Sequence, residues 1–190
     1  AERLLATMPD ELSHVMFACT GSEANDLAVR VAKTFTGGTG FIVTELAYHG
    51  LTDAVSQLSP SLGSSVAPGP HVRTVAPPDR SQMSDVGAQF RRQVEAAIAD
   101  LRSEGIRPAA LIVDTIFSSD GVFADPKGLL APAVEAIREA GGVFIADEVQ
   151  PGLGRTGETM WGFSRHGIVP DMVTAGKPMG NGHPLSAMFV

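Results

Sequence analysis

Cysteine, basic residues and aromatic residues are all scarce in this sequence of 190 residues. Cys19 is its only cysteine, which excludes an internal disulfide and a zinc site built from several cysteines, and fits a reducing compartment. The 14 Lys and Arg residues are outnumbered by 21 Asp and Glu, which gives a net charge of −7. No basic block accompanies an aromatic platform, so the sequence predicts no nucleic-acid partner.

Long apolar runs are absent as well. No run approaches the roughly 20 residues that a membrane helix needs, and the first residues lack the basic-then-apolar order of a secretory signal. We therefore expect a cytoplasmic protein with no membrane partner.

The sequence does contain enough apolar residues for one domain. Hydrophobic residues make up 44% of the chain, which is sufficient for a substantial core at this length. Residues 1–12 resemble the tail of a helix, and the last apolar run stops at Val190 with no helix behind it. These two features predict that the domain is cut at both ends.

Short apolar runs alternate with amphipathic segments along the whole chain. Apolar residues spaced at the helical period predict three helices, at 20–32, 86–101 and 130–137. The short runs predict strands at 14–19, 41–44, 71–75, 109–113, 142–146, 171–175 and 185–190. This alternation is typical of an α/β protein with a mainly parallel sheet and helices on both faces.

An acid and an amine follow two of these predicted strands. Asp147 comes directly after the run 142–146, and Lys177 follows the run 171–175 within Gly176-Lys177-Pro178, whose glycine and proline predict irregular backbone around the lysine. Ligands of open α/β sheets bind at the carboxyl ends of the strands, so both side chains are expected at one ligand-binding edge. A pyridoxal phosphate site needs this pair, because lysine forms the Schiff base and aspartate keeps the pyridine nitrogen protonated. Chance pairing of a strand-end aspartate with a loop lysine is the alternative.

The segment after the first predicted strand has the signature of a helix start. Thr20 and Glu23 match a capping box, and an apolar stripe follows on one face of the helix. Unpaired backbone N–H groups and the positive end of the dipole make such an N-terminus an anion site, so Gly21 and Ser22 are candidates to hold a phosphate. An ordinary capped helix explains the same pattern.

The single tyrosine, Tyr48, follows the predicted strand 41–44 at the same sheet edge. Its flat face is suited to stacking on an aromatic ring, and a buried tyrosine with a satisfied hydroxyl is the alternative. The glycine run 37–40 precedes its strand and so lacks the strand-glycine-helix order of a dinucleotide site.

Four motifs taken together resemble the class III aminotransferases, which are pyridoxal phosphate enzymes of fold type I. They are Thr20-Gly21-Ser22-Glu23-Ala24-Asn25, Tyr48-His49-Gly50, the run from Asp147 to Gly157 and the run from Pro170 to Lys177. The resemblance covers essentially all of the chain. It implies a three-layer α/β/α fold whose seven-stranded, mainly parallel sheet has an antiparallel last strand. Residues 1–190 would then be the large, cofactor-binding domain, without an N-terminal segment and a C-terminal small domain.

The resemblance also implies a cofactor, partners and roles for single residues. The cofactor is pyridoxal 5'-phosphate, the substrates are a small-molecule amine donor and an oxo acceptor, and the full-length protein is a homodimer or higher homo-oligomer. Lys177 carries the Schiff base and moves the proton, and Asp147 pairs with the ring nitrogen. The remaining roles are phosphate binding by Gly21 and Ser22, stacking by Tyr48 and Val149, and a hydrogen bond from Gln150 to the ring oxygen.

The exact reaction stays open at this point. Transamination from an amine or amino acid to a 2-oxo acid or aldehyde is the leading interpretation. Phospho-lyase, aminomutase and decarboxylase chemistry, a noncatalytic scaffold and a nucleotide-binding module are the alternatives. At Asp114 the family usually has a glutamate, and the shorter side chain leaves the role of this position undecided.

Overall fold

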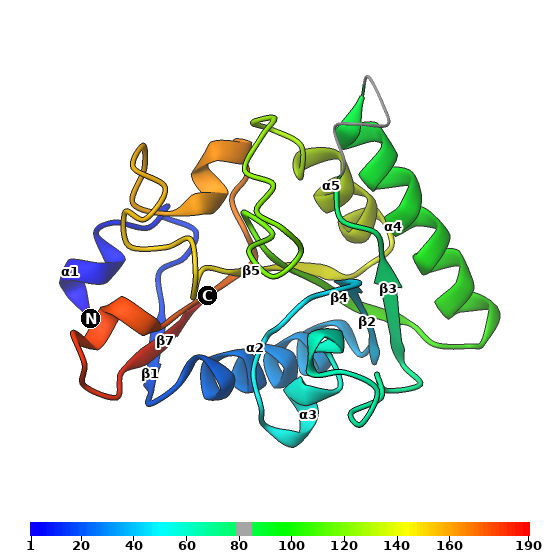
Figure 1. The fold of residues 1–190 in the computed structure, drawn as a ribbon, viewed down its shortest axis with the longest axis horizontal. Helices are drawn as coiled ribbons and strands as arrows, with labels where there is room; N and C mark the ends of the chain where they lie inside the picture. Colours follow the sequence, from blue (N-terminus) through cyan, green and yellow to red (C-terminus); the bar gives the residue numbers. More distant parts are fainter. Residues whose placement is uncertain (79–84) are drawn as a thin grey trace.

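The structure, a computed structural model, describes residues 1–78 and 85–190 as a sheet with helices on both faces (Figure 1). Within these ranges the sheet has seven strands in the order β1-β7-β6-β5-β4-β2-β3. The strands are β1 Val15–Ala18, β2 Gly40–Thr44, β3 Val72–Val75, β4 Pro108–Asp114, β5 Val143–Asp147, β6 Met172–Ala175 and β7 Ser186–Phe189.

The last strand runs against all the others. β7 pairs antiparallel with both β1 and β6, whereas the pairs formed by β2, β3, β4, β5 and β6 are parallel. The expected mixed, mainly parallel sheet with an antiparallel last strand is therefore confirmed. The predicted strand ends differ from the observed ones by at most one residue.

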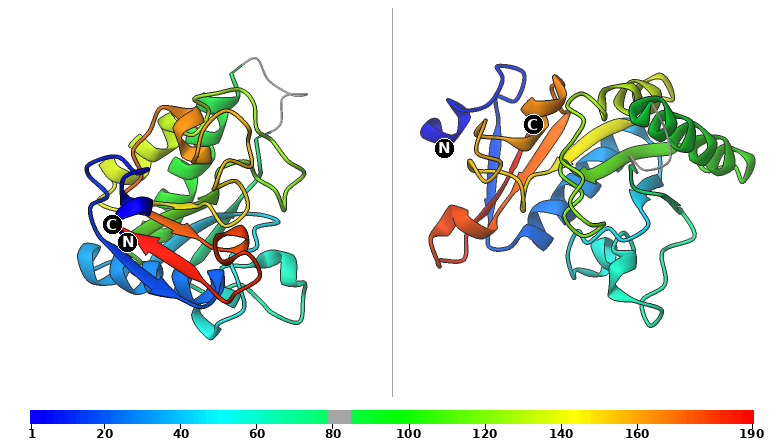
Figure 2. Two further views of the ribbon diagram at one scale, coloured as in Figure 1. Left: turned by 90° about the vertical axis from the view of Figure 1, so that its left-hand side faces the viewer. Right: turned by 45° about the horizontal axis from the view of Figure 1, so that its top comes forward.

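Three long helices form the outer layers. α2 (Gly21–Thr36) covers one face, and α4 (Val86–Ser103) and α5 (Ala131–Glu139) cover the other (Figures 1 and 2). Shorter helical turns fill the connections: α1 Glu2–Leu5, α3 Asp53–Ser56, η1 Pro60–Leu62, η2 Gly162–His166 and η3 Lys177–Gly180. No helix in the described ranges is long and apolar enough to cross a bilayer.

α2 begins at the predicted capping box and continues to Thr36, four residues beyond the predicted end. The Thr20 hydroxyl accepts a hydrogen bond from the Glu23 N–H at 3.2 Å, and the Glu23 carboxylate accepts one from the Thr20 N–H at 2.8 Å. This reciprocal capping box satisfies backbone groups that have no partner inside the helix. At the other end Gly37 adopts a left-handed conformation (φ 64°), which ends the helix at low steric cost.

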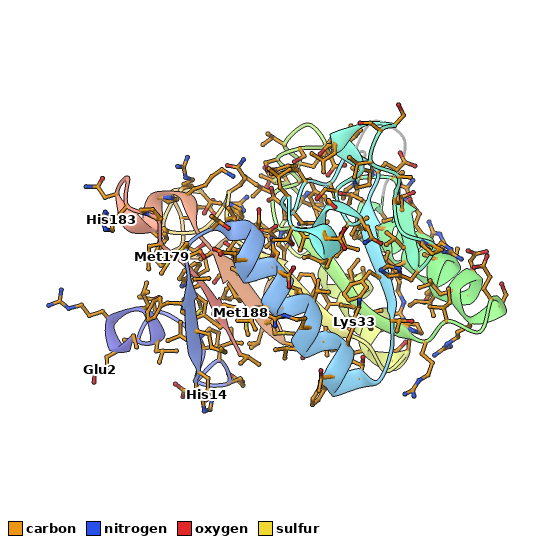
Figure 3. The ribbon with its side chains drawn as sticks, turned by 90° about the horizontal axis from the view of Figure 1, so that it is seen from below. Glu2, His14, Lys33, Met179, His183 and Met188 are labelled. Atoms are coloured by element: carbon orange, nitrogen blue, oxygen red, sulfur yellow. The ribbon has the colours of Figure 1, made fainter. Side chains whose placement is uncertain are left out.

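Alternating side chains of each strand build two cores. In β4, Leu111 and Val113 join the cluster under α4 and α5, whereas Ala110 and Ile112 join the cluster under α2. The second cluster includes Met188 of β7, which Figure 3 shows beside α2. Burying one large aliphatic side chain contributes about 1.5–3 kcal/mol, so both faces anchor the strand ends that form the site.

One local expectation is wrong. Gly176 and Pro178 indicated irregular backbone around Lys177, but residues Lys177–Gly180 form a turn of 3₁₀ helix. Proline is compatible with the first turn of a helix because its missing N–H would have no intrahelical partner there. Lys177 is therefore held on a short ordered element.

Candidate active site

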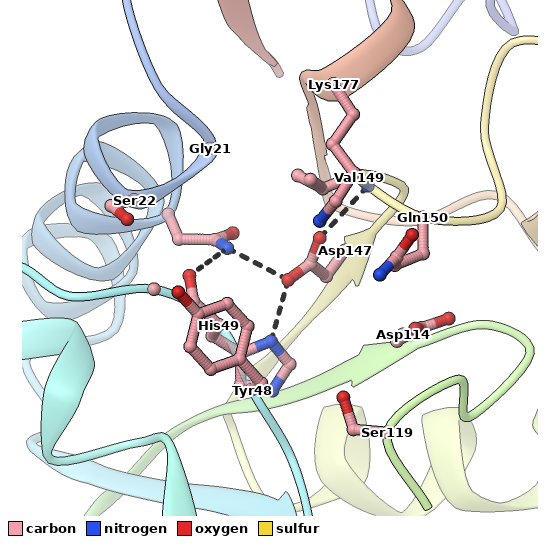
Figure 4. A pocket seen from close by; sticks show the side chains of 12 residues that line it. Gly21, Ser22, Tyr48, His49, Asp114, Ser119, Asp147, Val149, Gln150 and Lys177 are labelled. Carbon is pink, nitrogen blue, oxygen red and sulfur yellow. Dashed lines mark hydrogen bonds and ion pairs between the residues drawn. The ribbon is translucent and has the colours of Figure 1, made fainter. Parts of the chain in front are cut away.

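A pocket lies at the carboxyl ends of β4, β5 and β6, beside the N-terminus of α2 (Figure 4). Its volume is about 150 Å³. The lining includes every site residue predicted from the sequence: Gly21, Ser22, Tyr48, Asp147, Val149, Gln150 and Lys177. The structure therefore brings together residues that lie far apart in the chain. Asn25, His49, Gly50, Asp114 and Ser119 complete the wall.

Asp147, the last residue of β5, is held at the pocket by three hydrogen bonds. Its side chain is buried, and one oxygen, Oδ2, accepts hydrogen bonds from His49 Nδ1 at 2.7 Å and from Asn25 Nδ2 at 2.9 Å. The other oxygen, Oδ1, accepts from the Val149 N–H at 3.1 Å. Three donors therefore surround this carboxylate and fix its position at the pocket.

Asn25 and His49 hold Asp147 without having been predicted as site residues, although both lie inside the motifs Thr20–Asn25 and Tyr48–Gly50. Asn25 lies on the buried face of α2 beside Ala24 and Ala28, and only 1% of it is exposed. A polar side chain within an apolar stripe needs a buried partner, and that pattern was the available signal. His49 gave no comparable signal, because its burial depends on how the loop after β2 folds back.

Lys177 follows β6 through Gly176, and its side chain extends toward Asp147 in Figure 4. The residue is exposed, and its φ of 39° lies in the left-handed region that residues with a Cβ avoid. Such conformations cost on the order of 1–3 kcal/mol and cluster at functional sites. The surrounding β6, η3 and β7 therefore hold Lys177 at the pocket although its backbone would otherwise prefer a negative φ.

The N-terminus of α2 presents free backbone donors to the pocket. The first intrahelical bond joins Ala24 N to Thr20 O at 3.1 Å, so the N–H groups of Gly21 and Ser22 precede it. Gly21 cannot be enlarged without cost, because a Cβ there would lie 3.0 Å from Val149 Cγ2. The Ser22 hydroxyl accepts from the Leu51 N–H at 3.0 Å, which ties the loop after Tyr48 to this helix end.

Tyr48 and Val149 supply apolar surface on the pocket wall. Tyr48 is 41% exposed, so the alternative of a buried tyrosine does not hold. Gln150 points its amide into the same space (Figure 4). A carboxylate, an amine, a helix N-terminus and two apolar faces fit an aromatic, phosphorylated, carbonyl-bearing cofactor.

Asp114, at the end of β4, is engaged by its own loop. Its carboxylate accepts hydrogen bonds from the Ile116 N–H at 3.0 Å, from the Ser118 N–H at 3.1 Å and from the Ser118 hydroxyl. Burial raises the pKa of Asp114, and the Ser118 hydroxyl opposes that rise. The shorter side chain thus holds the turn after β4, and the exposed Ser119 lies beyond it at the pocket.

Glu148 is buried but lies outside the pocket lining. Its carboxylate accepts from the Thr115 hydroxyl at 2.7 Å and from the N–H groups of Gly162 and Phe163 at 2.7 and 2.8 Å. Burial raises the pKa of Glu148 to about 7, while these three donors act in the opposite direction. Glu148 therefore ties the end of β5 to η2 and to the segment after β4.

A mainly parallel sheet that presents a lysine and a buried carboxylate at its carboxyl edge is the arrangement of the fold type I pyridoxal phosphate enzymes. Comparison with family models makes this specific, because the model of the class III aminotransferases (Aminotransferase class-III) matches residues 1–190. The chain belongs to this family, and its cofactor is pyridoxal phosphate.

Individual relatives carry two different activities in their names. The chain is 38% identical over 200 residues to an alanine–glyoxylate aminotransferase 2-like protein of Drosophila melanogaster, covering 99% of the chain and 40% of the relative. It is 36% identical over 208 residues to ethanolamine-phosphate phospho-lyase homolog 1 of Caenorhabditis elegans, covering 99% and 44%. A solved structure of an Arthrobacter phospholyase in complex with phosphoethanolamine superposes with a TM-score of 0.94 at 38% identity, covering 100% of the chain and 46% of that protein.

The chain thus spans less than half the length of each of these relatives. The names of these relatives support a transaminase or a phospho-lyase and do not distinguish between the two.

Proposed function

We propose that the chain carries the cofactor-binding half of a transaminase site, which moves an amino group from an amine or amino acid to a 2-oxo acid or aldehyde. The observation that carries this proposal is the placement of the Lys177 amine beside the buried, triply hydrogen-bonded carboxylate of Asp147 in one pocket. Residues 1–190 act in this proposal as the large domain of a homodimer or higher homo-oligomer in the cytoplasm.

The bound cofactor supplies an electron sink when its ring nitrogen carries a proton. Asp147 would be the group that pairs with that protonated nitrogen, and three hydrogen-bond donors hold its carboxylate in place at the pocket. An asparagine at position 147 would carry no negative charge to keep the ring nitrogen protonated.

Lys177 would hold the cofactor covalently through its amine. When that bond is open, the same amine would be the group that removes and returns a proton at the substrate Cα. The ordered turn that begins at Lys177 keeps the amine within reach throughout.

The other pocket residues bind and orient. The N–H groups of Gly21 and Ser22 hold the phosphate at the start of α2, and Tyr48 and Val149 enclose the ring. Gln150 donates to the ring oxygen. Holding the ring in one plane decides which substrate bond lies perpendicular to it, and hence which bond breaks.

Phospho-lyase activity is the second candidate, supported by the Arthrobacter and Caenorhabditis elegans relatives. Both reactions begin with the same proton removal by Lys177. The two reactions would then differ in their products, because a phospho-lyase releases phosphate from the substrate whereas a transaminase passes the amino group to an oxo acceptor.

The test uses the full-length protein loaded with pyridoxal phosphate. One assay supplies an amine and a 2-oxo acid and measures the new amino acid, and a second supplies phosphoethanolamine and measures released phosphate and aldehyde. Amino transfer without phosphate release supports the leading proposal, and the reverse supports the second. A protein that neither binds the cofactor nor turns over in either assay contradicts both proposals. The same assays are run on Lys177→Ala, with Lys33→Ala as its matched control.

A further inference from the structure

We propose that Asn25 is a positioning residue: its side-chain amide fixes the orientation and the charge of the Asp147 carboxylate toward the ring nitrogen. The inference rests on the proposed cofactor role of Asp147 and adds to it a residue in another layer of the fold. Asn25 lies in the second turn of α2, where the helix otherwise presents alanine to the sheet.

Every polar atom of this amide has an assigned partner. Asn25 Nδ2 donates to the backbone oxygen of His49 at 2.8 Å and to Asp147 Oδ2 at 2.9 Å. Asn25 Oδ1 accepts from the Thr174 hydroxyl at 2.7 Å. Since a hydroxyl and a carbonyl fix the two ends, the amide has one orientation only, with its NH₂ group toward Asp147.

The same amide joins four segments that build the pocket. It connects α2, the loop after β2 that carries Tyr48, the end of β5 and β6, which leads to Lys177. Asn25, Thr174 and Asp147 are all nearly inaccessible to solvent, with exposures of 1%, 0% and 4%. Water cannot easily replace a lost hydrogen-bond partner at this buried place. Loss of one of these hydrogen bonds should therefore weaken the hold on the Asp147 carboxylate.

Charge explains why an amide suits this position. Asn25 donates to Asp147 without carrying a proton that it can give up, so it stabilises the negative charge and leaves the carboxylate able to pair with a protonated ring nitrogen. His49 approaches the same oxygen at 2.7 Å. Two donors on Oδ2 leave Oδ1, which accepts from the Val149 N–H at 3.1 Å, as the oxygen better able to accept a further hydrogen bond.

Asn25→Asp tests this role, because it preserves shape and removes the donor. Above the pKa of the new pair, two carboxylates face each other, and binding of pyridoxal phosphate should weaken roughly ten- to hundredfold. On acidification the pair keeps one proton, the protonated group becomes a donor again, and affinity should recover. The new carboxylate itself titrates, so a variant that adds no charge is needed to separate the loss of the donor from the gain of a charge.

Thr174→Val provides an independent test with a change of similar volume. It removes the hydroxyl that orients the amide, so it should weaken cofactor binding in the same direction but less than Asn25→Asp. Two controls change matched groups outside the pocket. Asp26→Asn alters one charge on the same helix, where Asp26 pairs with Arg30 at 3.3 Å, and Thr34→Val removes a hydroxyl that bonds only a helix carbonyl.

The experiment titrates full-length apoprotein with pyridoxal phosphate from mildly acidic to alkaline pH and records the dissociation constant and the visible absorbance of the bound cofactor. Thermal unfolding of each apoprotein shows whether it is folded. If Asn25→Asp does not fold, the cofactor affinity of Thr174→Val tests the role of Asn25 instead. Parent-like affinity and absorbance of either folded variant across the pH range overturn the role of Asn25. A parent protein that binds no cofactor overturns the proposed function, and this inference with it.

Discussion

Asp147 and Glu148 are adjacent in sequence, yet their carboxylates have entirely separate partners. Asp147 meets Asn25 and His49 at the pocket, whereas Glu148 meets Thr115 and the backbone of η2. Successive residues at a strand end point to opposite sides, so one dipeptide supplies both a site group and a structural group.

Lys177→Ala should abolish covalent attachment of pyridoxal phosphate and nearly all turnover in the full-length protein. Borohydride reduction of the loaded parent followed by peptide mapping should place the cofactor on Lys177. Lys33 lies over the ring of Phe41 at 5.5 Å and should stay unlabelled, so Lys33→Ala is the matched control. Label on Lys33 or Lys127 would show that the site is assigned to the wrong lysine.

Asp147→Asn should bind cofactor but turn over at least roughly a hundredfold more slowly, the scale on which positioned electrostatic groups act. The amide cannot hold the ring nitrogen protonated in the way a carboxylate does. Steady-state rates beside a cofactor titration separate the two effects, and Asp53→Asn at the exposed start of α3 is the control. Parent-like turnover would remove the electron-sink role from Asp147.

Glu148→Gln should change how stability depends on pH. The folded-state pKa of Glu148 is about 7 against an ordinary 4.5, so the folded state binds this proton more tightly. Its contribution is full below the unfolded pKa and is lost as pH rises through the folded pKa, a loss of up to about 3 kcal/mol.

The Glu148→Gln variant has no such proton, so its free energy of unfolding relative to the parent should rise between pH 4.5 and about 7. Denaturant unfolding of both proteins at several pH values measures the difference. A constant difference across that window would mean that the three donors outweigh burial and keep the carboxylate ionised.

Gly21→Ala should weaken cofactor binding about tenfold while changing stability little. The new Cβ would meet Val149 at 3.0 Å, and alanine is otherwise well tolerated in a helix. Cofactor titration of this variant tests the predicted loss of affinity, and its thermal unfolding tests the predicted stability. Gly87→Ala in α4, away from the pocket, is the control, and equal affinity of both variants would argue against a tight fit at Gly21.

Local patterns predicted much of the fold. The capping box of Thr20 and Glu23, the apolar stripe of α2 and the short β-rich runs are short-range signals, and each lies where it was expected. The order of the strands depends on contacts between distant segments. The antiparallel direction of β7 was expected only from the family resemblance, because an apolar run carries no sign of its direction.

The candidate site divides in the same way. Asp147 and Lys177 were recognisable because each follows a strand at the ligand-binding edge. The partners of Asp147 were not, since nothing in their local sequence states which strand end they will meet. The 3₁₀ turn at Lys177 was missed because a single turn is too short to show a period.

The pairing of β1 with β7 places the earliest strand of the sheet beside the latest one, with Val15 opposite Phe189. During synthesis on the ribosome, β1 has no partner in this sheet until β7 has left the exit tunnel. Closing so long a loop is slow, and an unpaired strand is prone to association with other chains. The helix end at Gly21 follows β1 directly, so the proposed phosphate cradle is expected to assemble last and only after translation has passed Phe189.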